Sequence, residues 1–386
     1  MQLGFGKYIR IILIALFALA FTATSFCDPL SGGNTQNDSK TRKQIDHLRK
    51  LAARGHVPEQ IELAAAYMTG RGVPQDLIQA AHWYQRAALS GDPDAENQIG
   101  YFCQYGIGVP VDPIRAFHWY QLASASGSLQ AKVNMGVSYL IGMGVRANPS
   151  TARQLFLEAA QKGSGLGAAY LGDVYLFGSG VARDPAESEK WFAMGVRQHD
   201  PVAAFNLAYL FSIAADHEHD LARAVHFLQL SAAKGYVPGI HQLGLLLVRH
   251  PELADSPQQA VSLLQESSTA GTWKSSVILG ILARDGRTAP ADPALASYYF
   301  HLAVLQGGDK ASRYLAAELA NLASKLPPGE DSARAAQAGQ AFQQRQLPML
   351  FVLRENEQQK HFPVAAIADY GAGFQSGYGT ALQPGQ

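Results

Sequence analysis

Residues 91–127 read GDPDAENQIGYFCQYGIGVPVDPIRAFHWYQLASASG, a segment that begins and ends on glycine. Glycine returns at the same 36-residue interval along most of the chain, and only His199 breaks the series. The series is Gly55, Gly91, Gly127, Gly163, Gly235, Gly271 and Gly307. A constant period of this length indicates repeated supersecondary units. The sequence therefore predicts an array of seven to eight stacked modules.

The first half of each unit has the spacing of an amphipathic helix. In the quoted segment, the apolar Ile99 precedes the small Gly100, and bulky residues follow on the same face. A pair such as Gly106 and Gly108 then ends the helix, since glycine readily adopts the left-handed conformation found there. The small position is Ala64, Gly100, Gly136, Gly172, Ala208, Gly244, Gly280 and Ala316 in successive units.

A second helix follows in each unit. Asp112 and its equivalents, Asp76, Asn148, Asp184, Asp220, Ser256 and Asp292, are expected to cap it, because their side chains accept the free amide hydrogens of a first turn. Its large aromatic residues should pack on the small positions of neighbouring helices, and we expect this of Trp83, Trp119 and Trp191. No unit can cover both of its apolar faces alone, so the units must stack. The predicted fold is an all-α, right-handed α–α hairpin solenoid.

The complete pattern, A-x-x-x-L-G-x-x-Y-x-x-G-x-G-V-x-x-D-x-x-x-A-x-x-W-Y-x-x-A-A-x-x-G, resembles the Sel-one-like repeat (SLR) family, the longer relatives of the tetratricopeptide repeats. The resemblance covers about residues 41–345. It implies a superhelix like that of tetratricopeptide repeats in a bacterial secreted or envelope protein. Units five and six depart from the pattern, because Ala214 and Asp216, then His250 and Glu252, replace the glycine pair. These two turns should differ in shape from the others.

The ends of the chain predict its location. Lys7 and Arg10 precede an apolar run over residues 11–21, which favours a secretory signal peptide and a periplasmic or secreted protein. An uncleaved signal anchor is the alternative, and the bulky Phe26 disfavours a lipid anchor on Cys27. The expected regions are a leader at 1–25, a linker at 26–40, the solenoid with N- and C-terminal capping helices at 41–346, and a partly disordered tail at 347–386.

Charge and cysteine content argue against some classes of protein. The chain has 31 basic and 31 acidic residues, and a balance of this kind does not favour nucleic acid as a partner. It contains two cysteines, Cys27 and Cys103, too few for a disulfide framework. Cys103 stands where other units have tyrosine, which predicts a buried apolar role. No cofactor is expected.

Three patterns invite a chemical interpretation. Ser231–Lys234 has the S-x-x-K spacing of penicillin-recognising enzymes, but the equivalent stretches read ALSG, SASG and AQKG, and neither S-D-N nor K-T-G is present. The Asp216–Asp220 cluster could ligate a metal, although adjacent positions rarely point at one centre. His82, His118 and His226 share an offset on the outward face of the second helix. We assign no catalytic or metal residues; an envelope hydrolase or β-lactam-binding protein is the alternative function.

The predicted binding surface is the inner wall of the solenoid, lined by the first helices. Amide side chains recur there one residue before the apolar position, and they can both donate to and accept from the backbone of an extended peptide. The same amides could instead stabilise stacking by bonding a neighbouring turn. The predicted set is Gln98, Tyr101, Phe102, Tyr105, Asn134, Tyr170, Val174, Phe177, Asn206 and Gln242. We therefore predict a non-catalytic scaffold that binds a protein or peptide partner, with membrane contact only if the leader is uncleaved.

Overall fold

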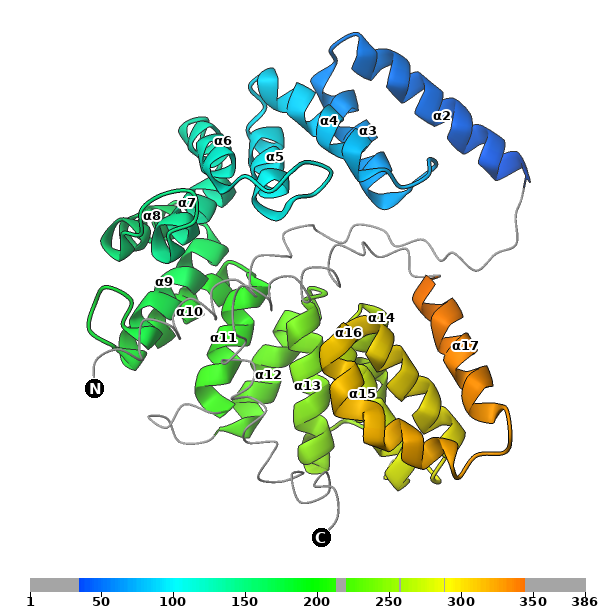
Figure 1. Cartoon of the computed structure of the whole chain (residues 1–386). Helices are drawn as coiled ribbons and strands as arrows, with labels where there is room; N and C mark the ends of the chain where they lie inside the picture. Colours follow the sequence, from blue (N-terminus) through cyan, green and yellow to red (C-terminus); the bar gives the residue numbers. More distant parts are fainter. Residues whose placement is uncertain (1–34, 213–219, 257, 288, 344–386) are drawn as a thin grey trace.

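The computed structural model describes residues 35–212, 220–256, 258–287 and 289–343, and every regular element in these ranges is a helix (Figure 1). The predicted all-α hairpin solenoid is confirmed, while the leader at 1–25 and the tail at 347–386 lie outside the described residues. The elements are α2 (Thr35–Ala53), α3 (Val57–Thr69), α4 (Leu77–Leu89), α5 (Pro93–Tyr105), α6 (Pro113–Ala125), α7 (Leu129–Ile141), α8 (Pro149–Gln161), α9 (Gly165–Phe177), α10 (Pro185–Arg197), α11 (Pro201–Ser212), α12 (Leu221–Ala232), α13 (Val237–Arg249), the 3₁₀ turn η1 (Pro251–Leu253), α14 (Gln259–Thr269), α15 (Trp273–Asp285), α16 (Pro293–Ala323) and α17 (Glu330–Gln343). No helix of the described ranges combines the length and apolarity needed to cross a bilayer.

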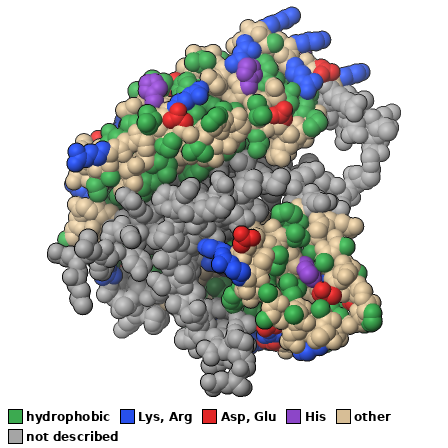
Figure 2. Space-filling view, viewed as in Figure 1, with side chains coloured by type: hydrophobic (Ala, Val, Ile, Leu, Met, Phe, Trp, Pro, Cys, Tyr) green, Lys and Arg blue, Asp and Glu red, His purple; other side chains and the backbone are tan. Residues whose placement is uncertain are grey.

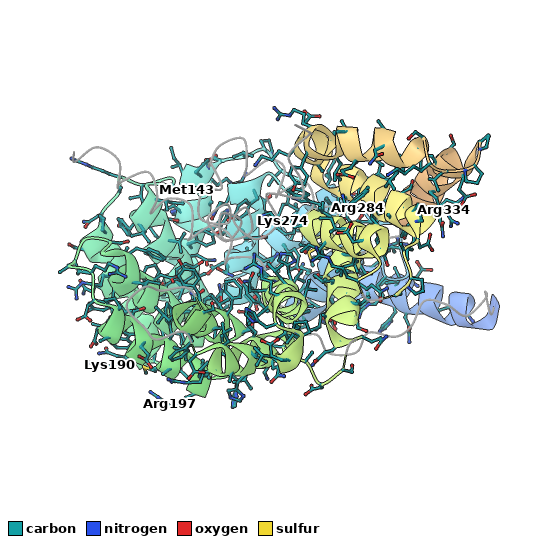
Figure 3. All side chains as sticks on the ribbon, turned by 90° about the horizontal axis from the view of Figure 1, so that it is seen from below. Met143, Lys190, Arg197, Lys274, Arg284 and Arg334 are labelled. Atoms are coloured by element: carbon teal, nitrogen blue, oxygen red, sulfur yellow. The ribbon has the colours of Figure 1, made fainter. Side chains whose placement is uncertain are left out.

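The helices alternate between an inner and an outer wall. The first helices of neighbouring hairpins pack directly on one another, as α7 does on α9, α9 on α11 and α11 on α13, whereas consecutive second helices make no comparable contact. The first helices therefore line the concave side of the array. Lys190 and Arg197 of the second helix α10 lie at the outer margin, and Lys274 of the first helix α15 lies near the middle (Figure 3). The array curves so that α2 and α17 lie on the same side of the molecule.

The caps of the second helices follow the sequence pattern. The side-chain oxygens of Asp76, Asn148, Asp184, Asp220 and Asp292 each accept a backbone N–H of the first turn that follows. Asp112 does the same at 2.9 Å from the amide of Arg115. The expectation for Ser256 is wrong, because α14 begins two residues later, after Gln258, without a side-chain cap.

The small positions of the first helices receive an aromatic ring from the second helix of the same hairpin. A methyl group added at Gly100 would meet the ring of Tyr120 at 2.8 Å, and at Gly136 and Gly172 it would overlap Phe156 and Phe192. The packing residue is thus the one after the tryptophan position, and the expectation that Trp83, Trp119 and Trp191 fill this role is wrong. Those three indole side chains are buried or half-buried, and their N–H groups have no hydrogen-bond partner within the described structure.

The glycine pairs lie in the turn within a hairpin and pack against the preceding hairpin. Both glycines of a pair have positive φ, as in Gly142 at 72° and Gly144 at 71°. The second glycine touches the preceding hairpin so closely that a methyl group at Gly144 would overlap the carbonyl oxygen of Pro113, and one at Gly108 would overlap that of Leu77. The turn of unit six differs as predicted, because His250, which follows α13, has a φ of −126° and leads directly into η1. The turn of unit five, residues 213–219, lies outside the described residues.

The two ends of the array depart from the predicted boundaries. Helix α2 starts at Thr35, inside the region predicted as a linker, and buries Ile45 and Ala52 as a cap should. At the other end, α16 consists of two helical segments that meet at a kink at Gly308, where φ is 56° and ψ is −140°. Residues Ala311–Ala323 form the second segment of α16, and α16 packs against α17.

His199 shows why glycine dominates the repeat boundary. It is the one residue other than glycine with a positive φ among those described, at 59°, where the equivalent Gly163 has 95°. His199 is exposed, and its replacement by glycine should raise the free energy of unfolding by about 0.5–1 kcal/mol. The substitution relieves the strain of a side chain in the left-handed conformation, and this gain exceeds the cost of the greater conformational entropy that glycine gives the unfolded chain. Thermal melting of the variant checks this. The control Ser126→Gly, at φ −78°, should lower the melting temperature, since no strain is relieved there.

Candidate functional site

The inner wall separates the ten predicted binding residues into three groups. Phe102, Tyr170 and Val174 are fully buried, and the amides of Asn134 and Asn206 are buried as well. The remaining residues are half-buried at the surface: Gln98, Tyr101, Tyr105, Phe177 and Gln242. Only this last group presents side-chain surface that a partner could contact.

Phe102, Tyr170 and Val174, three of the predicted binding residues, therefore offer no surface to a partner. The Phe102 ring packs edge-on against Tyr84, with 5.5 Å between ring centroids, and Tyr170 stacks on Phe156 at 5.1 Å. In both pairs the partner belongs to the second helix of the preceding hairpin. These side chains point between hairpins because the sequence offset places them on the stacking face of the first helix, not on its concave face.

The buried amides tie neighbouring first helices together. Asn134 Nδ2 donates to Asn97 Oδ1 at 2.7 Å, which joins α7 to α5. Asn206 Nδ2 donates to Asp173 Oδ1 at 3.0 Å, which joins α11 to α9. Each bond therefore links two repeats, and the alternative interpretation, that these amides stabilise stacking, is confirmed at both positions. The bonded neighbour is a side chain of the adjacent first helix and not a turn.

An acidic, tyrosine-rich core surrounds the second of these bonds. Burial raises the pKa of Asp173 well above its ordinary value, although the bond from Asn206 acts in the opposite direction, and its second oxygen has no partner in the described structure. Burial also raises the pKa of Asp200 to about 6. The buried hydroxyl of Tyr236 has no described partner either, and these two carboxyls raise the pKa of that phenol further. The raised pKa values mean that ionisation of these three buried groups is unfavourable in the folded protein.

The accessible part of the inner wall combines amide and aromatic groups. The rings of Tyr101 and Tyr105 lie 4.8 Å apart, centroid to centroid, on consecutive turns of α5. Gln98 comes one turn before Tyr101 on the same helix, so the three side chains form one patch. Phe177 ends α9, and Gln242 carries the amide position on to α13. Together these residues can form hydrogen bonds and apolar contacts with a polypeptide chain.

The S-x-x-K pattern has no catalytic geometry. Ser231 is fully buried, and its hydroxyl donates to the carbonyl of Pro201 at 2.8 Å, which links α12 to α11 of the same hairpin. Lys234 is exposed beyond the end of the helix. A nucleophilic serine needs contact with both a base and a substrate, and this hydroxyl has neither.

A second serine lies within hydrogen-bond distance of a histidine. His241 Nδ1 is 2.7 Å from Ser275 Oγ, and Ser275 Oγ is 2.5 Å from Ser267 Oγ. Both serines are fully buried, and burial, aided by the charge of Lys274, lowers the pKa of His241 to about 3. The imidazole is therefore neutral, and the hydroxyls are closed to a substrate. This chain of hydrogen bonds joins α13, α14 and α15 and serves stacking.

The other sequence candidates are surface or core residues. His82, His118 and His226 are exposed on second helices, as predicted. Cys103 is fully buried with a free thiol, as predicted. Residues 216–219 of the possible metal cluster lie outside the described residues, and Asp220 caps α12. Over the described ranges, no three histidine, cysteine or carboxylate side chains converge on a metal position.

Two features were missed by the sequence interpretation. The first is Asp173, because the equivalent positions of the other repeats do not carry a carboxylate, and only its hydrogen bond with Asn206 indicates its role. The second is a concentration of basic residues on α2, which the balanced charge of the whole chain conceals. A local count of charges, made helix by helix, would have found it.

Comparison with known proteins agrees with this architecture. The family model for the Sel1 repeat matches residues 60–92, 93–128, 129–164, 166–200, 201–236 and 278–308. The unmatched stretch between the last two contains unit six, whose turn lacks the glycine pair. The search of curated proteins found no match.

One solved structure supports the same fold, and others match with lower TM-scores. A Sel1 repeat protein from Oxalobacter formigenes is 23% identical with a TM-score of 0.53, and the match covers 64% of this chain and 98% of that one. The match to c5321, a protective antigen of uropathogenic Escherichia coli with an SLR fold, has 21% identity and a TM-score of 0.32 over 82% of this chain and 90% of that one. Immunity protein Pa5087 from Pseudomonas aeruginosa is 19% identical, with a TM-score of 0.41 over 55% and 81%. Because the matched repeats span more than half of its residues and the helical hairpins stack as the repeat requires, the chain belongs to the Sel1 repeat family.

Proposed function

We propose that this chain is a non-catalytic scaffold of the cell envelope that holds a protein or peptide partner against its inner wall. The observation that carries the proposal is the division of labour among the first helices. Buried amides such as Asn134 and Asn206 lock adjacent repeats together, while Gln98, Tyr105 and Gln242 stay at the surface. A wall held rigid from within presents its surface groups with little loss of conformational entropy on binding.

The location in the envelope rests on the leader alone. Lys7, Arg10 and the apolar run at 11–21 have the composition of a signal peptide. Mass spectrometry of the protein purified from its host decides between the two forms of the proposal. A mature N-terminus close to residue 26 supports a released scaffold, and an intact leader supports an anchored one.

Site-specific photocrosslinking tests the inner wall. A photoreactive amino acid at Gln98 or Gln242 should capture a defined protein in intact cells, and the same group at Lys190 or Arg197 on the outer wall should not. The captured partner, once purified, should bind the Gln98→Ala, Gln242→Ala double variant about tenfold more weakly, because each lost hydrogen bond costs roughly 0.5–1.5 kcal/mol. Capture from the outer wall alone would contradict the proposal.

A further inference from the structure

Helix α2 ends the array and leaves one face without a neighbouring helix. It packs on α3 and buries Ile45 and Ala52, with Leu48 half-buried beside them. In the middle of the array a helix is covered on two sides, but no hairpin precedes α2 within the described residues. The side chains of Lys43, His47 and Lys50 on its other face are exposed.

The positive charge of the chain is concentrated in this helix and its end. Residues 40–54 contain six basic residues and one acidic residue. The basic residues are Lys40, Arg42, Lys43, Arg49, Lys50 and Arg54, and the acidic one is Asp46. Since the whole chain has 31 of each sign, the remainder has 25 basic and 30 acidic residues and is net negative. The zero net charge of the chain is therefore the sum of a positively charged N-terminal helix region and a net negative remainder.

The geometry of α2 gathers this charge into a line. Lys43, His47, Lys50 and Arg54 follow one another at intervals of three or four residues, so at 100° per residue they occupy a sector roughly 60° wide. All four are exposed, and Ile45 and Ala52 lie on the opposite side of the helix. Figure 2 shows lysine and arginine side chains gathered at the end of the array that α2 forms. We call these four residues the α2 basic stripe.

Helix α2 contains two carboxylates, Asp38 and Asp46, and Asp46, the one next to the stripe residue His47, does not neutralise the stripe. Asp46 lies to one side of it and receives Arg49 Nη1 at 3.2 Å. Arg49 also donates to the hydroxyl of Tyr67 at 3.2 Å, which fixes it toward α3. Lys43, Lys50 and Arg54 have no carboxylate partner among the described residues within ion-pair distance, so three charges face outward.

We propose that the α2 basic stripe docks on an anionic phospholipid surface, an interaction that goes beyond scaffolding by the inner wall. The stripe is straight and about 16 Å long, so the phosphate groups of a flat membrane surface can contact all four side chains at once. Helix α2 contains no phenylalanine, tyrosine or tryptophan on which nucleic-acid bases could stack. In the sequence it follows the apolar run at 11–21, so the stripe belongs to the end of the chain nearest a bilayer-seeking segment.

Vesicle sedimentation of the full-length chain tests the proposal. The substitutions Lys43→Gln, Lys50→Gln and Arg54→Gln are combined in one variant, and a control variant combines Lys162→Gln, Lys190→Gln and Arg197→Gln at exposed outer positions after α8 and on α10. Both lose three positive charges. Each basic residue at an anionic surface contributes roughly fivefold to partitioning, so the stripe variant should bind vesicles of phosphatidylcholine with about 30% phosphatidylglycerol on the order of a hundredfold more weakly. The control should bind like the native chain.

The dependence on lipid charge, salt and variant distinguishes lipid docking from a general effect of net charge. Binding contributed by residues 11–21 is common to all variants and persists on pure phosphatidylcholine, so only the stripe-dependent part must vanish without anionic lipid and weaken in high salt. Equal losses in both variants would reduce the effect to net charge and overturn the proposal. Tighter stripe-dependent binding to an oligonucleotide or to polyglutamate than to anionic vesicles would overturn the lipid assignment. Unchanged circular dichroism shows that the variants remain folded.

Discussion

Replacing Gly144 by alanine should destabilise the array by about 3 kcal/mol or more, whereas Gly127→Ala should cost about 1–2 kcal/mol. Both glycines have positive φ, 71° and 96°, so both variants suffer the strain of a left-handed side chain. They differ in surroundings. An added methyl group at Gly127 meets nothing within 4 Å, but at Gly144 it overlaps the backbone carbonyl of Pro113 in the preceding hairpin.

The large cost at Gly144 arises because a backbone group cannot move aside as a side chain can. The turn must lift away from the start of α6, and it carries Asn148, the cap of α8, with it. Denaturant unfolding of both variants measures the difference, and hydrogen exchange should show lost protection at the α6–α8 junction for Gly144→Ala alone. Gly108→Ala repeats the experiment one hairpin earlier, against the carbonyl of Leu77. Equal destabilisation at Gly127 and Gly144 would show that glycine serves only the turn and not the stacking.

The second large effect concerns the buried carboxyls. Asp200→Asn should stabilise the protein by about 1–3 kcal/mol at about pH 7.5, because burial holds the pKa of Asp200 at about 6 in the fold, against about 3.9 in an unfolded chain. The raised pKa means that the native state binds this proton more tightly. Its contribution to stability is present in full below the unfolded pKa and is lost as the pH rises through about 6. Asparagine removes the charge and retains the oxygen that accepts from the amide of Ala203.

The gain must therefore depend on pH. Thermal melting should show a higher midpoint for Asp200→Asn than for the native chain at about pH 7.5, with the difference vanishing near pH 4. Asp173→Asn should follow the same course, since burial raises the pKa of Asp173 in the same direction. The exposed cap variant Asp112→Asn, whose parent oxygen accepts from the amide of Arg115, serves as the control for the effect of the amide substitution itself. A gain that stays constant with pH would disprove an electrostatic origin.

The melting curve of the native chain alone would not reveal this effect. His241 acts in the opposite direction, because burial lowers its pKa to about 3, and the unfolded state gains protons at this residue as the pH falls below about 6.5. Its contribution to stability is lost on acidification, while that of Asp200 and Asp173 grows. Only the difference between a variant and the native chain at each pH isolates the carboxyls.

The positions of helices, caps and turns could be predicted because each depends on nearby residues. Asp112 caps α6 through an amide three residues away, and Gly106 ends α5 through its own φ of 71°. Such interactions repeat with the period of the chain, so one unit predicts the others. Even the break at His199 falls where the pattern indicates, and the backbone there keeps a positive φ.

The candidate site could be predicted only in part, because the same offset has different surroundings in different units. Gln98 and Gln242 remain at the surface, while Asn134 and Asn206 turn toward Asn97 and Asp173 of the neighbouring repeat. These partners stand at different offsets from their repeat glycines, 37 and 33 residues from the amides they meet. No count along the chain reveals such a pairing. The aromatic packing on Gly136 and Gly172 likewise depended on the rotation of one helix about another.

By itself, the sequence determined the period, the all-helical class and the local chemistry of most of the described turns, because glycine, aspartate and proline act on backbone within a few residues. Only the tertiary structure decided which side chains of the inner wall are buried between repeats and which stay available to a partner. It also revealed that the basic residues of α2 form one outward line. Burial and direction depend on where the neighbouring hairpin lies, and that is set by packing across the whole array.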